Sequence, residues 1–155
     1  TMSTYNAQNI GARQLDRVRK GFRSADVIGC IYAVAVGFIL FFAGKYFAYL
    51  FISDNAETVI PMVDIYLQCV GMFMIPLYVV NCYRNGFQGM GYGLLPMLSG
   101  VAELIGRGVM AVVAAHEKSY RMACMASPFA WIVATALLFV LYFYVMKDMK
   151  KKLCL

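Results

Sequence analysis

Four long apolar runs, separated by short polar segments, are the main pattern in this sequence. They cover about residues 26–52, 62–83, 93–115 and 122–146. The last run has no acidic or basic side chain, and the third has only Glu103 and Arg107. An α-helix needs roughly 20 mostly apolar residues to cross the hydrocarbon core of a bilayer. The pattern predicts an all-α integral membrane protein with four transmembrane helices, because a soluble helical core would need polar faces that these runs lack.

The segment before the first run, residues 12–24, has a helical pattern of its own. Leu15, Val18 and Phe22 recur at spacings of three and four residues, and most of the residues around them are basic or polar. This pattern predicts a short amphipathic helix that lies on the cytoplasmic surface of the membrane. A calmodulin-binding helix would look similar, but nothing else supports that interpretation. Lipid headgroups suffice as partners for the basic residues, so we expect membrane lipid and no nucleic acid.

The basic residues are distributed unevenly between the two sides of the predicted bundle. The net charge of the chain is +6. Ten Lys and Arg residues precede the first run, lie between runs two and three, or follow the last run, whereas only Lys118 and Arg121 lie on the opposite side. Cytoplasmic loops carry the Lys and Arg excess in membrane proteins. We therefore expect both chain ends, including the tail 147–155, to be cytoplasmic.

Turn-forming residues connect the runs. Ser53 and Asp54 suit a turn and a helix N-cap in the external segment 53–58. RNGFQGMGYG at 84–93 holds four glycines and predicts a cytoplasmic turn. Glycine-rich loops also bind phosphate, but that function needs a preceding strand and a free helix N-terminus. Pro76 and Pro128 lie inside runs and should kink the helices there.

Glu103 and Arg107 lie one helical turn apart in the third run. At about 100° per residue they share a face with small residues. The opposite face is aliphatic and holds Leu94, Leu98, Val101, Ile105, Val109 and Val112. Charges inside a membrane face the bundle interior, and small residues permit close helix packing, so we predict a buried ion pair. The pair either contacts substrate or protons or pins this helix to its neighbours. The structural or conformational role is favoured, because a paired carboxylate stays ionised and relays protons poorly.

Few other side chains point to chemistry. Gln68, Tyr78 and Asn81 are the polar groups of the second run, and they either line a cavity or form hydrogen bonds between helices. The five cysteines contain no CxxC pair, and the single histidine, His116, has no partner for a metal ion. No nucleophile, base and orienting group form a cluster. We therefore predict no enzyme, no catalytic residue, no metal site and no cofactor.

Five short motifs occur along the chain in a characteristic order. They are AQNIGARQLDRVRKGFR at 7–23, LFISD at 50–54, GFQGMGYG at 86–93, AELIGR at 102–107 and SPFAW at 127–131. As a set they resemble the carboxy-terminal half of the multidrug and toxic compound extrusion (MATE) transporters. The first motif resembles a helix end in that family, with Gln8, Asn9, Gly11 and Ala12 at its positions.

The resemblance implies a place for each part of the chain. Residues 1–11 would end the eighth of twelve membrane helices, and the four runs would be helices nine to twelve, part of a six-helix MATE-type lobe. The chain would then be a fragment that lacks the amino-terminal lobe, which becomes its expected partner. A natural four-span protein is the alternative.

The resemblance also implies a function. The family exports drugs or organic cations across the plasma membrane in exchange for Na+ or H+. Some branches place a carboxylate near the position of Leu77, and leucine binds neither an ion nor a proton. We therefore expect the coupling ion at a site outside this chain, and no coupled transport by this chain alone. Two alternatives stay open: a lipid-linked oligosaccharide flippase of the same fold family, and a small membrane subunit that supports assembly without transport.

Overall fold

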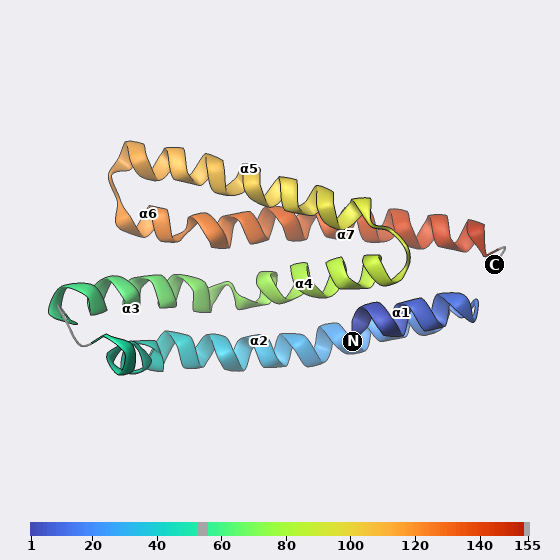
Figure 1. Cartoon of the computed structure of the whole chain (residues 1–155), viewed down its shortest axis with the longest axis horizontal. Helices are drawn as coiled ribbons and strands as arrows, with labels where there is room; N and C mark the ends of the chain where they lie inside the picture. Colours follow the sequence, from blue (N-terminus) through green and yellow to red (C-terminus); the bar gives the residue numbers. More distant parts are fainter. Residues whose placement is uncertain (53–55, 154–155) are drawn as a thin grey trace.

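The structure is an antiparallel bundle of helices, shown in Figure 1. The computed structural model describes residues 1–52 and 56–153, and these contain no β-strand. The helices in chain order are α1 (Met2–Gly11), α2 (Leu15–Phe51), α3 (Ala56–Met72), α4 (Met74–Gly89), α5 (Leu94–Glu117), α6 (Tyr120–Cys124) and α7 (Ala126–Lys152). The predicted turn and N-cap roles of Ser53 and Asp54 lie outside the described residues.

The described helices provide three candidate crossings of a membrane, or four if one bent pair counts as a crossing. α2, α5 and the stretch Tyr120–Lys152, which holds α6 and α7, are each long and apolar enough to span a bilayer. α3 and α4 meet the same criterion as a pair, with a bend of 57° between them. Three of the predicted crossings are thus confirmed by length and composition, and the second one is a crossing if the bent pair α3–α4 forms a single span.

The α1–α2 connection and the carboxyl end of α7 lie at the same end of the bundle. The α1–α2 connection, the α4–α5 turn and the carboxyl end of α7 are at one end in Figure 1, and the α2–α3 and α5–α6 connections are at the other. The first end carries the basic residues of 13–23 and 147–152, so we call it the basic end.

Two prolines mark the breaks in the crossings. The ring of a helical proline clashes with the carbonyl group of the residue four positions before it. α3 ends at Met72, four residues before Pro76, and α6 ends at Cys124, four residues before Pro128. The predicted kink at Pro76 is confirmed by the 57° bend, whereas before Pro128 the structure shows a helix break and the kink itself stays a prediction.

The amphipathic segment is not a separate helix on the membrane surface. α2 runs without a break from Leu15 to Phe51, so residues 15–24 are the first turns of a crossing helix. Leu15, Val18 and Phe22 are buried in a core shared with α4 and α7. The prediction of a surface helix was wrong because an apolar stripe at this spacing suits packing on helices as well as on lipid.

Small residues let α2 approach the next crossing closely. Its buried positions beyond the basic segment are all Gly or Ala: Gly29, Ala33, Gly37, Gly44 and Ala48. A Cβ atom on Gly37 would lie 2.6 Å from the carbonyl oxygen of Gly71 in α3. Stripes of small residues permit such backbone contacts between membrane helices.

The glycine-rich segment 84–93 is mostly helical. α4 continues to Gly89, and the chain turns only afterwards, where Gly91 has a φ of +86°. Gly86 and Gly89 face neighbouring helices: a Cβ on Gly89 would lie 2.1 Å from the carbonyl oxygen of Ser3 in α1. The predicted turn is therefore confirmed for residues 90–93 and wrong for Gly86 and Gly89, whose missing side chains make room for helix packing.

Candidate functional site

The charged pair of α5 belongs to a larger network that includes α4. Glu103 Oε1 accepts a hydrogen bond from Arg107 Nη2 at 2.6 Å, and Glu103 Oε2 accepts one from Arg84 Nη2 at 2.7 Å. Arg84 Nε also donates to Ser99 Oγ at 2.6 Å, and the Ser99 hydroxyl donates to the carbonyl of Pro96 at 2.8 Å. We call Arg84, Ser99, Glu103 and Arg107 the arginine–glutamate network.

Glu103 is the centre of this network and the less exposed partner in each ion pair. Its side chain is 12% exposed, compared with 25% for Arg84 and 49% for Arg107. Both carboxylate oxygens of Glu103 are occupied by guanidinium donors. One carboxylate and two guanidinium groups leave the network with a surplus of one positive charge among the described residues.

The sequence predicted the pairing of Glu103 with Arg107 but missed Arg84. The glycines that follow Arg84 placed it in a predicted loop, whereas it lies in α4 and reaches across to α5. The sequence did contain a signal for this contact, because more than one guanidinium group lies near a single intramembrane carboxylate. Charges inside a membrane require partners. The network links the second and third crossings, and its conformational role stays a prediction.

The small-residue and aliphatic faces of α5 lie as predicted, but the expected burial of the whole ion pair was wrong, because the Arg107 side chain is 49% exposed. The buried residues of α5 are Pro96, Ser99, Gly106 and Ala114. A Cβ on Gly106 would lie 3.1 Å from the Cα of Ala130 in α7, so small residues bring these helices together. The predicted aliphatic face is exposed along its length: Leu94, Leu98, Val101, Ile105, Val109 and Val112.

The other predicted polar residues make separate local bonds. Gln68 donates to Asp64 Oδ2 at 3.0 Å within α3, and the exposed Asn81 donates to the carbonyl of Leu77 at 2.9 Å within α4. Tyr78 donates to the carbonyl of Ala25 in α2, so of these three residues it forms the hydrogen bond between helices. Its ring lies against Gly29, where no side chain would fit.

The motif at the amino-terminal helix end has the expected local structure. α1 ends at Gly11, and Ala12 caps it. Asn9 is buried and donates to the carbonyl of Tyr5 at 2.8 Å, while Gln8 is exposed. The resemblance implied a helix end at this position, and the structure has one.

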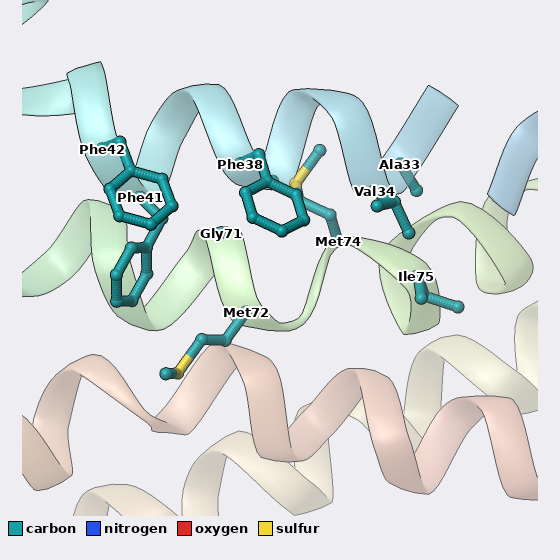
Figure 2. Close-up of a pocket in the computed structure, with 10 residues that line it drawn as sticks. Ala33, Val34, Phe38, Phe41, Phe42, Gly71, Met72, Met74 and Ile75 are labelled. Carbon is teal, nitrogen blue, oxygen red and sulfur yellow. The ribbon is translucent and has the colours of Figure 1, made fainter. Parts of the chain in front are cut away.

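An apolar hollow of about 280 Å³ lies beside the break between α3 and α4 (Figure 2). Its lining comes from α2, α3 and α4: Ala33, Val34, Gly37, Phe38, Phe41, Phe42, Gly71, Met72, Met74 and Ile75. No charged side chain lines it, so it suits a lipid chain or the apolar part of a ligand. Among residues 1–52 and 56–153, no three His, Cys, Asp or Glu side chains gather as metal ligands would.

Comparison with known proteins identifies the family. The sequence model of the MatE family matches residues 1–113 of the chain. The chain belongs to the MatE family. No individual curated protein and no solved structure matches it significantly. MatE proteins are transporters, and the whole arginine–glutamate network lies inside the matched range.

Proposed function

We propose that this MatE chain forms part of a secondary transporter that exports drugs or organic cations in exchange for Na+ or H+. The observation that carries the proposal is the family match over residues 1–113. The four crossings and the polar network between two of them are consistent with a moving membrane bundle. The apolar hollow, with its Phe and Met side chains, fits the hydrophobic part of an organic cation.

The transporter resides in the plasma membrane, with its basic end in the cytoplasm. Ten Lys and Arg residues belong to the basic side and two to the other. This asymmetry is the usual determinant of orientation in multi-pass proteins.

The main coupling ion binds outside this chain. Glu103 is saturated by two guanidinium groups, and Leu77 stands where some family branches have a carboxylate. Alternating access also requires two repeats that move around a central site, and these four crossings are less than one six-helix repeat. The chain therefore works together with an amino-terminal lobe.

Transport in vesicles tests the proposal. One set of vesicles contains the chain alone, and another contains it with the amino-terminal lobe of a MatE protein. We expect a Na+ or H+ gradient to drive transport of a fluorescent organic cation only in the second set, and transport to stop when the gradient is collapsed. Gradient-driven transport by the chain alone would contradict the placement of the coupling site. Movement of a labelled lipid-linked oligosaccharide in place of the cation would favour a flippase.

A further inference from the structure

Asp26 is a second carboxylate that is largely enclosed between helices, and its surroundings are opposite to those of Glu103. It lies in α2, directly before residues 27–44, which contain no acidic or basic side chain. Its Oδ2 accepts a hydrogen bond from the hydroxyl of Tyr83 in α4 at 3.0 Å. Its Oδ1 is buried and has no hydrogen-bond partner among the described residues. No ion pair of the described residues includes Asp26.

The groups that face Asp26 are aromatic or weakly acidic. Tyr83 of α4 bonds to it directly, and Tyr78 and Cys82 of α4 and Tyr142 of α7 lie near enough to interact with its charge. On α1, the hydroxyl of Tyr5 donates elsewhere, to the carbonyl of Arg17. The basic residues nearest in sequence, Arg19 and Arg23, are exposed on α2.

The rings of three aromatic residues close the site from one side. The ring of Phe22 lies one helical turn before Asp26, with its centroid 5.0 Å from that of Tyr83 and 5.4 Å from that of Tyr142. Phe22 is 1% exposed and Tyr83 3% exposed, so water has little access to the Tyr83 side of Asp26. A carboxylate in such a place loses its hydration without gaining a counter-ion, and this favours the neutral acid.

We propose that Asp26 is a proton-binding site of the transporter, additional to the main coupling site outside this chain. Oδ1 takes up a proton from water when the contact between α2 and α4 opens, and a new O–H bond forms there. Oδ2 continues to accept from Tyr83, which keeps its own proton. When the contact next opens to water of lower proton concentration, the O–H bond of Asp26 breaks and the proton returns to water. The carrying step rests on the proposed transport function; the protonation of Asp26 does not.

Infrared spectroscopy of the chain in lipid vesicles tests the protonation directly. At pH 7 an ordinary aspartic acid, with a pKa of about 3.9, is protonated in roughly one molecule in a thousand. We expect the chain to show the C=O stretching band of a protonated carboxyl group at this pH, and Asp26→Asn to remove it. Asp16→Asn is the matched control, because Asp16 is on the same helix with a side chain that is 92% exposed. This variant keeps the band.

Tyr83→Phe gives a second readout that does not depend on the folding of Asp26→Asn. Loss of the hydroxyl donor removes the hydrogen bond to Oδ2, so we expect the band to shift in frequency and to remain present. Tyr32→Phe, at an exposed position of α2, leaves the band where it is. A wild-type spectrum without the band at pH 7, or a band that persists unchanged in both Asp26→Asn and Tyr83→Phe, overturns the proposal.

The two proposals fail in different ways. The infrared band needs no transport, so a chain that shows the band but supports no cation export contradicts the transport function and leaves proton binding by Asp26 intact. Cation export without the band overturns the role of Asp26 alone.

Discussion

At the scale of single residues, the chain contains two carboxylates that are largely enclosed between helices and have opposite partners. Glu103 accepts from two guanidinium groups, whereas Asp26 accepts from a tyrosine hydroxyl. Guanidinium partners offset the cost of enclosing a carboxylate, and enclosure without them favours the neutral acid. The surroundings, and not the residue type, therefore give Glu103 a role in linking helices and Asp26 a role in binding a proton.

The network predicts an order of stabilities that a simple pair does not. Glu103→Gln leaves two guanidinium groups without a carboxylate, and we expect it to cost about 3 kcal/mol of unfolding free energy. Adding Arg107→Gln recovers only part of this loss, because Arg84 stays unpaired; adding Arg84→Gln as well recovers more. Arg107→Gln alone has a small effect, since Arg84 still neutralises Glu103. Melting temperatures in lipid nanodiscs give the order.

The matched control for this series is Glu117→Gln, at the exposed end of the same helix, which should leave the melting temperature unchanged. A double variant at Glu103 and Arg107 that is as stable as the wild type would show that Arg84 contributes nothing. The geometry would then be a simple i, i+4 pair.

The sequence predicted the contact within one helix and missed the contact between helices. Glu103 and Arg107 share a face because a helix turn has 3.6 residues, which is visible in any sequence. The bond from Arg84 depends on the register of α4 against α5 and on where α4 ends. The periodicity of the sequence reveals neither of these. Asp26 was overlooked for the same reason, since the hydroxyl bonded to its Oδ2 comes from Tyr83 on another helix.

At the scale of elements, glycines and prolines decide how the helices fit. Apolar runs predicted the crossings well because bilayer thickness fixes their length. The prolines predicted the positions of the helix breaks, because a proline ring clashes with the preceding turn of its own helix. The glycines of 84–93 were less informative, since a glycine in a turn and a glycine under a packed helix look the same in sequence.

The contact between α1 and α4 gives a test of this packing. Gly89→Ala would place a Cβ 2.1 Å from the backbone oxygen of Ser3, so α1 must move away. We expect a loss of roughly 1–3 kcal/mol of unfolding free energy, as for other overpacked contacts. Gly108→Ala is the matched control, because Gly108 lies in α5 with no atom within 4 Å of the added Cβ. Equal melting temperatures for the two variants would contradict the tight contact.

At the scale of the whole molecule, the basic end is held together by side chains from distant parts of the chain. The hydroxyl of Tyr92, in the α4–α5 turn, donates to Asp148 in α7, and Lys152 Nζ lies 2.8 Å from the same carboxylate. Burial and the bond to Asp148 raise the pKa of Tyr92, so its hydroxyl stays protonated and continues to donate. This cluster fixes the turn against the end of the last crossing.

Four crossings bring the α1–α2 connection, the 90–93 turn and the carboxyl end of α7 to one side of the membrane. Thiol labelling in intact cells tests this arrangement most directly, with single cysteines placed in a variant whose five native cysteines are replaced. Gln14, Gln88 and His116 are suitable positions, because all three are exposed and none is a Lys or Arg that sets orientation. The variant without any cysteine is the control for background labelling.

A membrane-impermeant thiol reagent should label His116→Cys in intact cells. It should label Gln14→Cys and Gln88→Cys only after the cells are permeabilised. Labelling of Gln14→Cys and Gln88→Cys from outside, or labelling that places these two positions on different sides, would contradict the arrangement of the four crossings.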